Sequence, residues 1–544
     1  MNGAKLLVEE LQSRGVTFVS TLCGHGLDPF LMAATEAGLR IVDTRNEQAA
    51  AYIAEAYSRL SRRVGVCAVS SGVAVANALT GIVNAHFDGA PVLLISGCGA
   101  LSTRNMGHFQ DLNQVALAAP VCKWSRLAES PDRIPQMIAE AFAVATMGRP
   151  GPVHLMLPLD VQQARVKEES LIRSPGSSSS IGGFPLGDPA LIAETAKWIG
   201  EARRPLLIAG SGVFYAEGEG ALAAFVRSRA IPVVIPIWDR GSVTAPLNEF
   251  MGVLGAASGG PALLSDADLV ILAGASFDYR IGYLEPPAVH STVRVVRIHT
   301  DVGELSKGAK AHLSLLASPA AVLRQLDAEC RERGIAPHTT WLEEAARRKQ
   351  DFRKRCLGAR EKVAKGLHAL DVLRAIETVL TDETVLLIDG GNIGQWAHQI
   401  LCNRYPGHWL TCGASAVVGW GLPGAMAARI AYPERPIILL SGDGAFTFTI
   451  AELESARRQG LNFVAVIADD QAWGITLWEQ TREFGQGMAS ELGPVSFDLI
   501  AEGFGCRGVR VTSEAELHRA LREGLAAQRP TVIHAPIVRS SPAD

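Results

Sequence analysis

Short apolar runs alternate along this chain with longer segments whose apolar residues recur every three or four positions. Near the N-terminus, the runs at residues 18–21 and 64–69 are separated by an alanine-rich segment with helical spacing at residues 47–60. Apolar runs of this length predict buried strands, and the longer spacing predicts amphipathic helices. Strands that alternate with helices form parallel sheets through right-handed crossovers. The pattern therefore predicts an α/β protein built on parallel sheets.

This alternation occurs three times, with two boundaries between the repeats. The expected strands are residues 18–21, 41–43, 64–69, 91–96 and 153–157, then 205–209, 232–235, 269–273 and 293–298, and finally 384–388, 436–440, 463–468 and 531–536. Residues 174–183 have the Ser- and Gly-rich composition of a flexible linker, and residues 341–365 form a charged helical connector. We expect three doubly wound parallel-sheet domains, at residues 1–173, 184–340 and 341–544.

Composition is consistent with this organisation and excludes some partners. A chain of 544 residues is too long for one hydrophobic core. Its 48% hydrophobic residues and net charge of −4 favour neither nucleic acid nor an anionic membrane surface as a partner. Residues 1–10 predict an amphipathic helix rather than a signal peptide, and no apolar run is long enough to span a bilayer. Nine cysteines without a Cys-x-x-Cys pair indicate thiols in a reducing compartment, so we expect a cytoplasmic protein.

Residues 442–474 combine two expected strands with two acidic turns. Gly442-Asp443-Gly444 follows one strand, and Asp469-Asp470-Gln471-Ala472 follows the next. Adjacent parallel strands end at the same edge of a sheet, where such sheets bind ligands, so Asp443 and Asp470 should lie close together. Carboxylates with a backbone carbonyl suit Mg²⁺, and glycine turns at helix N-termini suit a diphosphate. By themselves these residues are equally consistent with ordinary solvated turns.

The same stretch resembles the motif of thiamine diphosphate enzymes, in which Gly-Asp-Gly precedes an Asn-containing turn. The resemblance implies that Asp443, Asp470 and the backbone carbonyl of Ala472 bind Mg²⁺. The chain departs from the family at Asp469-Asp470, where an Asn pair is usual. A second carboxylate adds negative charge beside the diphosphate, which implies tighter metal binding or a different metal preference.

Further matches extend the resemblance over nearly the whole chain. Residues 389–396 resemble the diphosphate loop, and residues 413–423 resemble the loop that holds the pyrimidine. In the second loop, the carbonyl of Ala416 is implied to accept from the 4′-amino group, and Val418 to bend the cofactor; simple core packing is the alternative for Val418. The cofactor-binding residues implied are Gly72, Gly391, Asn392, Ile393, Ala416, Val418, Gly442, Asp443, Gly444, Ala445, Asp470, Gly474 and Ile475.

The catalytic candidates are three residues of the first expected domain, residues 1–173. Glu47 matches the family acid that hydrogen-bonds N1′ of the aminopyrimidine and so promotes loss of the thiazolium proton; the alternative is a helix N-terminal acid that favours the macrodipole. Gln110 matches a glutamine on the substrate side of the thiazolium, and otherwise would be a polar loop residue. His25 adjoins Gly26, which aligns with the catalytic histidine of benzaldehyde lyase, so His25 is either a proton shuttle or a surface residue.

The resemblance covers acetolactate synthase, benzaldehyde lyase and 2-hydroxyacyl-CoA lyase. It implies a carboligase or lyase that makes or breaks a C–C bond next to a carbonyl, in a 2-keto acid or a 2-hydroxy ketone. In the family, residues equivalent to Glu47 and Asp443 meet between chains, which implies a homodimer or homotetramer. A catalytically idle subunit that binds thiamine diphosphate is the alternative from another class, motivated by Asp470 and opposed by the intact Glu47.

The central domain has partial matches to the binding sites of two redox cofactors. Acetolactate synthase would bind FAD there, and Phe277-Asp278-Tyr279-Arg280 resembles part of that site, but residues 251–260 do not form a convincing glycine-rich FAD segment. FAD is therefore possible but unsupported by the sequence. A NAD-dependent dehydrogenase would rest on Gly210-Ser211-Gly212 alone, which lacks the third glycine of the dinucleotide fingerprint.

Overall fold

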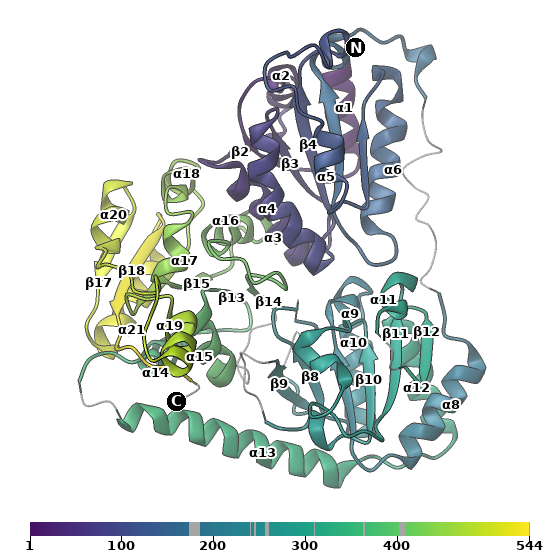
Figure 1. Cartoon of the computed structure of the whole chain (residues 1–544), viewed down its shortest axis with the longest axis vertical. Helices are drawn as coiled ribbons and strands as arrows, with labels where there is room; N and C mark the ends of the chain where they lie inside the picture. The colour runs from purple at the N-terminus through teal and green to yellow at the C-terminus, as the bar shows by residue number, and fades with distance from the viewer. Residues whose placement is uncertain are drawn as a thin grey trace. The chain divides into compact units, whose positions relative to one another are not determined.

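The three alternations form three six-stranded sheets (Figure 1). The computed structural model describes residues 1–172, 185–239, 241–243, 246–255, 261–308, 311–362, 365–401 and 408–542. Neighbouring strands pair in parallel throughout all three sheets. This confirms the prediction of three parallel-sheet domains with interleaved helices. The predicted linker at residues 174–183 lies outside the described residues.

The first sheet has the strand order β2-β1-β3-β4-β6-β5. Its strands are β1 (Phe18–Leu22), β2 (Arg40–Asp43), β3 (Gly65–Val69), β4 (Val92–Cys98), β5 (Trp124–Leu127) and β6 (Val153–Pro158). Its helices are α1 (Gly3–Ser13), α2 (Asp28–Glu36), α3 (Glu47–Ser61), α4 (Val73–Asp88), α5 (Gln114–Ala118), α6 (Ile134–Thr146) and α7 (Leu159–Gln163). Strands β3, β4 and β6 are buried along their whole length, as expected for parallel strands covered on both faces.

The second sheet has the order β12-β11-β10-β7-β8-β9. Its strands are β7 (Pro205–Ala209), β8 (Val233–Pro236), β9 (Phe250–Leu254), β10 (Leu269–Ala273), β11 (Arg294–His299) and β12 (Leu313–Leu316). Its helices are α8 (Pro189–Glu201), α9 (Ser211–Tyr215), α10 (Glu219–Arg229), α11 (Val302–Ser306) and α12 (Pro319–Glu332). In this doubly wound order the direction of the crossovers reverses between β7 and β10, which is where such sheets form a ligand crevice.

The third sheet, β14-β13-β15-β16-β18-β17, repeats the strand order of the first. Its strands are β13 (Val385–Asp389), β14 (His408–Thr411), β15 (Ile437–Gly442), β16 (Val464–Asp469), β17 (Arg507–Arg510) and β18 (Thr531–Pro536). The long helix α13 (Thr339–Gly358) precedes it, followed by α14 (Ala369–Val379), α15 (Gly391–Leu401), α16 (Gly421–Ala431), α17 (Asp443–Thr447), α18 (Glu452–Arg458), α19 (Gly474–Phe484), α20 (Phe497–Gly503) and α21 (Glu514–Ala526). The first and third sheets therefore share one strand order.

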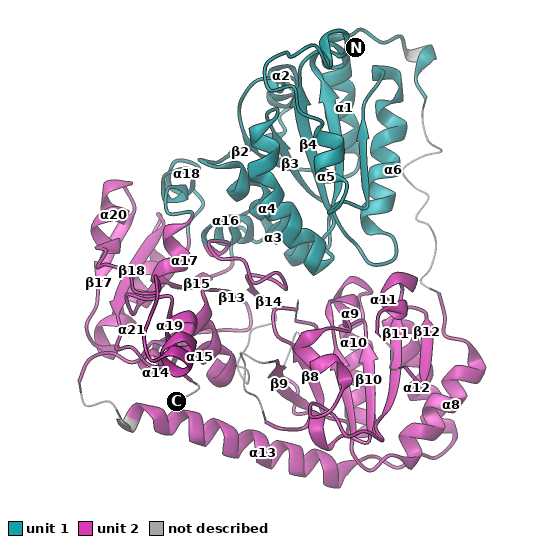
Figure 2. Cartoon of the chain, in the orientation of Figure 1, with its two compact units in different colours: residues 1–182, 422–434, 449–462 teal, residues 183–421, 435–448, 463–544 magenta. Residues whose placement is uncertain are grey.

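The chain divides into two compact units (Figure 2). Unit 1 contains residues 1–182, 422–434 and 449–462, and unit 2 contains residues 183–421, 435–448 and 463–544. The segment 449–462, which carries α18, follows β15 in sequence yet belongs with the first sheet. Contacts far apart in sequence therefore assign this helix to unit 1.

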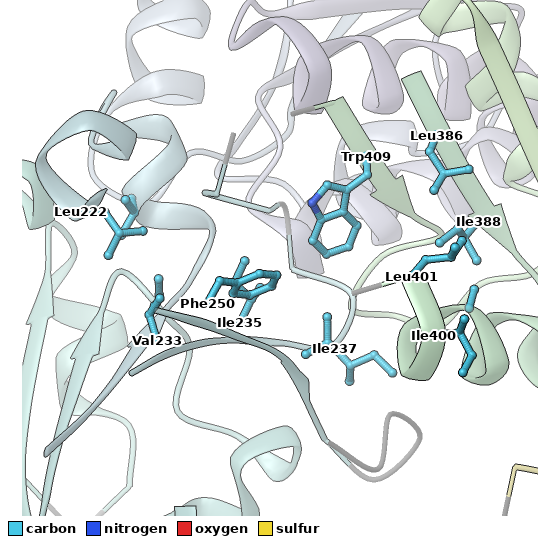
Figure 3. Close-up of a cluster of buried hydrophobic side chains, with 14 of the residues drawn as sticks. Leu222, Val233, Ile235, Ile237, Phe250, Leu386, Ile388, Ile400, Leu401 and Trp409 are labelled. Carbon is cyan, nitrogen blue, oxygen red and sulfur yellow. The ribbon is translucent and has the colours of Figure 1, made fainter. Parts of the chain in front are cut away.

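In unit 2, one hydrophobic cluster extends from the second sheet into the third (Figure 3). Ile237, Phe250 and Trp409 are among its buried members. A Cβ atom on Gly241 would lie 2.5 Å from the Trp409 ring, so glycine allows this close packing. The second and third sheets thus share apolar core. None of the helices in the described ranges is long and apolar enough to cross a membrane.

Candidate active site

A cavity of about 410 Å³ in unit 2 lies where strands of the third sheet end. Its walls include the residues that follow β13, β15 and β16 and the first turns of α15, α17 and α19. Every cofactor and metal residue expected on the third domain lines it: Gly391, Asn392, Ile393, Ala416, Val418, Gly442, Asp443, Gly444, Ala445, Asp470, Ala472, Gly474 and Ile475. The fold therefore gathers these dispersed motifs around one space.

Glycines keep the floor of this cavity open. Gly390, at the end of β13, has a φ of +99°, a backbone conformation that residues with a Cβ atom rarely adopt. A Cβ atom on Gly474 would lie 2.8 Å from the Cβ of Asn392 and 2.9 Å from Oδ2 of Asp470. The helices α15 and α19 begin at this floor, and helix N-termini offer N–H groups and positive dipole ends to an anion.

Asp443 and Asp470 are two buried carboxyl groups on adjacent strand ends. Burial, followed by the negative charges of Asp470 and Asp469, raises the pKa of Asp443 to about 7. Burial also raises the pKa of Asp470, although Asn392 donates a hydrogen bond to its Oδ2 at 3.1 Å and opposes that shift. A divalent cation between these groups would replace repulsion by attraction.

The side chains of the described residues do not complete a metal site by themselves. No group of three or more His, Cys, Asp or Glu residues that could hold a metal is found among them. A cation here would need further oxygens besides the two carboxylates, from the Ala472 carbonyl, from water or from a bound ligand. Mg²⁺ commonly binds in this way, through one or two carboxylates and substrate phosphates.

The departure from the family at Asp469 has a structural explanation. Oδ2 of Asp469 lies 2.8 Å from Nε2 of His534 on β18, and Nδ1 of His534 lies 3.1 Å from Oδ1 of Asp498. Oδ1 of Asp469 accepts the N–H of Gln471 at 3.1 Å, and Gln471 has a φ of +54°. The Asp469 carboxylate is therefore engaged within the sheet, where it pairs with a histidine and fixes the turn that carries Asp470.

Residues near the C-terminus hold the same turn in place, and no sequence pattern identified them. Arg539 donates from Nε to the Asp470 carbonyl at 2.9 Å and from Nη2 to the Gln471 carbonyl at 2.8 Å. The carbonyl of Ser540 accepts from Nδ2 of Asn392 at 2.8 Å. Sequence reasoning also missed Ile237 and Trp238 of the central domain, which line the cavity. A short polar tail and a loop after a strand have no periodicity that would identify them.

Glu47, the acid expected to activate the cofactor, lies in unit 1 at the first position of α3. Asn46 caps the helix by accepting the N–H of Gln48. Asn77 on α4 donates from Nδ2 to Oε2 of Glu47 at 3.0 Å. The helices α3 and α4 pack closely where Gly81 of α4 faces Ala51 of α3. A Cβ atom on Gly81 would lie only 2.5 Å from the Cβ of Ala51. Asn77 thus holds one oxygen of a partly exposed carboxylate.

The structure brings Gly72, Gln110 and the His25 loop together at one edge of the first sheet. Ser71 donates from Oγ to Oε1 of Gln110 at 2.8 Å, and Gln110 has a φ of +56°. A Cβ atom on Gly72 would lie 2.7 Å from the Cβ of Gln110. The exposed His25 ring stands edge-on to Phe109, with ring centres 5.3 Å apart. The buried Gln114, which was not among the predicted site residues, accepts the N–H of Gly72.

The cavity fits a thiamine diphosphate tail. Within the described residues, Oδ1 of Asn392 is buried without a hydrogen-bond partner, although Asn392 lines the cavity. Such a polar atom usually has a partner in the functional state, which a ligand or ordered water would supply. The glycine floor and the helix N-termini would suit a diphosphate, and the pair of carboxylates would suit a cation.

Comparisons with known proteins agree with this geometry. Models of the thiamine pyrophosphate enzyme N-terminal TPP binding domain, central domain and C-terminal TPP binding domain match residues 1–117, 192–326 and 389–535. The chain is 29% identical, over 98% of its length and 91% of the relative, to a probable acetolactate synthase large subunit from Methanocaldococcus jannaschii. It is 28% identical, over 99% of its length and 96% of the relative, to the acetolactate synthase isozyme 2 large subunit from Escherichia coli. It is also 28% identical, over 97% of its length and 88% of the relative, to 2-hydroxyacyl-CoA lyase 2 from Caenorhabditis elegans.

Proposed function

The chain belongs to the thiamine pyrophosphate enzymes, and from this premise we propose a reaction and a role for each residue of its site. The enzyme is a thiamine diphosphate-dependent carboligase or lyase. We propose that it acts on a 2-keto acid or a 2-hydroxy ketone, and makes or breaks the C–C bond next to the carbonyl. The observation that supports this most is the cavity in unit 2, which collects all the expected diphosphate and metal residues of the third domain.

Thiamine diphosphate, when bound, supplies a nucleophilic thiazolium carbon for attack on a carbonyl. The residues that would hold its diphosphate are Gly391, Asn392, Ile393, Gly442, Gly444, Ala445, Gly474 and Ile475. Asp443, Asp470 and the Ala472 carbonyl would hold Mg²⁺, and Asn392 keeps Asp470 oriented toward the cavity. Ala416 would accept from the 4′-amino group, and Val418 would support the bent cofactor.

The site residues of unit 1 would transfer protons and orient the substrate. Glu47 would exchange a proton with N1′ while Asn77 fixes its other oxygen, and Gly72 would lie beside the pyrimidine. Gln110 would orient the substrate, and the exposed His25 would move a proton at the site entrance.

We propose a homodimer or homotetramer. In it, Glu47 of one chain would hydrogen-bond the pyrimidine of the cofactor whose metal is held by Asp443 of another chain. Val73, Met106 and Phe109, which lie close in sequence to Gly72 or Gln110, are 63%, 75% and 65% exposed, and this suits a surface covered by a second copy. A cytoplasmic location is consistent with the free thiols of the described cysteines, several of them buried.

The turn after β7 in the central domain does not fit the diphosphate of FAD; of residues 251–260, the segment from 256 to 260 lies outside the described residues. After β7, the N–H groups of Gly210, Gly212 and Val213 bond to backbone carbonyls at 2.8–3.0 Å, and the N–H of Ser211 bonds to Oδ2 of Asp239 at 2.9 Å. Asp239 is buried and paired with Arg280. A diphosphate at this turn would meet a carboxylate and no spare N–H donor.

We therefore expect the purified protein to be colourless. Its spectrum should lack the flavin band near 450 nm, and added FAD should leave the melting temperature unchanged, because a ligand raises it only by binding the folded state. Thiamine diphosphate with Mg²⁺ is the matched positive control and should raise it. A yellow protein with stoichiometric flavin would contradict this prediction.

A substrate panel tests the proposed function. Enzyme loaded with thiamine diphosphate and Mg²⁺ is given pyruvate and other 2-keto acids, benzoin, and 2-hydroxyacyl-CoA, and consumption of each is measured. We expect turnover of a 2-keto acid or 2-hydroxy ketone. Exclusive turnover of the CoA thioester would favour the second candidate, a 2-hydroxyacyl-CoA lyase, which the relative from Caenorhabditis elegans motivates. Cofactor binding without any turnover would contradict both and favour an idle subunit.

A further inference from the structure

Helix α18 holds the loop that leads into Glu47, although about 400 residues of chain separate them. Oε1 of Glu452, at the first position of α18, accepts the backbone N–H of Arg45 at 2.8 Å. Glu452 is only 1% exposed. Both elements lie in unit 1. One buried carboxylate therefore fixes the backbone two residues before Glu47.

The outer side of the same loop is held by residues at the end of α18. Arg458 donates from Nη1 and Nη2 to the two oxygens of the Asp43 carboxylate, at 2.9 and 2.6 Å. Gln459 donates from Nε2 to the Asp43 carbonyl at 2.8 Å. Arg45 also pairs with Glu454. Paired N–H groups on both carboxylate oxygens define orientation as well as distance. We call Glu452, Arg458 and Gln459 the loop clamp.

The loop clamp places an ionisable side chain, Glu452, in a buried position. Burial raises the pKa of Glu452 to about 7, which shows that an anion here is poorly solvated. A buried carboxylate is unfavourable unless hydrogen bonds compensate it, and an apolar residue would fill this space without that cost. These hydrogen bonds instead fix the orientation of residues 43–46. Because these residues determine where α3 begins, they also determine the position of Glu47.

We propose that the loop clamp positions Glu47. It holds the Glu47 carboxylate where it can hydrogen-bond N1′ of the bound cofactor. The proposal rests on the proposed function, since it assumes that Glu47 activates thiamine diphosphate. Asn77 fixes the carboxylate from α4, and the loop clamp fixes the backbone from α18. Glu452 and Arg458 act through Glu47 and do not touch the substrate.

The test removes the loop clamp and measures the step that needs Glu47. In Glu452→Ala and Arg458→Ala, we expect kcat and the rate of hydrogen–deuterium exchange at C2 of bound thiamine diphosphate to fall about tenfold or more, because small displacements of a catalytic group are costly. The Mg²⁺ and cofactor concentrations for half-saturation should stay within about twofold, since the carboxylates in unit 2 are unchanged. Glu452→Gln keeps an acceptor for the Arg45 N–H and should retain most of the exchange rate.

Two further variants separate positioning from stability. Asp43→Arg combined with Arg458→Asp reverses the ion pair and should recover part of the exchange rate lost in Arg458→Ala. Arg126→Ala removes an exposed arginine that pairs with Glu140 elsewhere in unit 1, and should leave exchange unchanged. Arg458 is partly exposed, so Arg458→Ala should fold even if Glu452→Ala does not.

The outcomes distinguish failure of this inference from failure of the proposed function. Exchange at the wild-type rate in a folded loop-clamp variant would overturn the positioning role. Equal loss in Glu452→Gln and Glu452→Ala, together with lowered cofactor affinity, would also overturn it and indicate a general structural role. If Glu47→Gln itself exchanges at the wild-type rate, the assignment of Glu47 fails instead.

Discussion

Replacing Glu47 by Gln should slow turnover by about 10²- to 10⁴-fold while leaving the protein folded and able to bind thiamine diphosphate. The amide keeps an acceptor for the Asn77 N–H, so the start of α3 should remain in place. It cannot deliver a proton to N1′, and deprotonation of the thiazolium carbon should become rate-limiting. Glu47 is partly exposed, which limits the effect of the substitution on stability.

Two measurements check this prediction. Hydrogen–deuterium exchange at C2 of the bound cofactor should fall in parallel with kcat, while the cofactor-induced rise in melting temperature should persist. Gln48→Ala is a suitable control, because it changes the adjacent residue of α3 and should cost little activity. Full activity of Glu47→Gln would exclude Glu47 as the activating acid and leave it as a helix N-terminal residue.

The strands that the sequence pattern failed to predict differ from most of the predicted strands in their position within the sheets. The five strands that were not predicted, β5, β9, β12, β14 and β17, all lie at the edge of a sheet. In β5, β12 and β17 most positions are partly or fully exposed, whereas the central strand β10 is buried throughout. A parallel strand reads as a continuous apolar run only when both its faces are covered. Edge strands escape that constraint, so their pairing is decided by the rest of the fold.

The candidate site shows the same division between local and distant information. Asp443, Asp470 and their glycines could be predicted because a strand end, a turn and a helix start are each encoded locally. Arg539, which holds the Asp470 turn, and Glu452, which holds the loop before Glu47, could not. Each of these two side chains bonds to a backbone group far away in sequence. Every residue type has such backbone groups, so the partner cannot be recognised from its side chain.

Asp443→Asn should abolish Mg²⁺-dependent binding of thiamine diphosphate. The wild-type cofactor should stabilise the folded state by about 2.7 kcal/mol at a hundredfold excess over Kd, and the variant should lose that rise in melting temperature because the amide carries no charge for the cation. Asp470→Asn is the matched comparison, since Asn is usual in the family at that position, and it should retain cofactor binding. Titrations of both variants with cofactor and Mg²⁺ followed by thermal unfolding measure the difference.

The cofactor-free proteins give an independent readout of the same carboxylate. The pKa of Asp443 is raised from 3.8 to about 7, so the folded state binds its proton more tightly than the unfolded state. Stability is therefore lost as pH rises through that window, and at pH 8 the buried carboxylate destabilises the protein without cofactor. Without cofactor, Asp443→Asn should melt at the wild-type temperature or above it at pH 8, with a smaller difference at pH 5. A lower melting temperature at both pH values would show that Asp443 supports the fold, and loss of cofactor binding could then no longer be assigned to the metal.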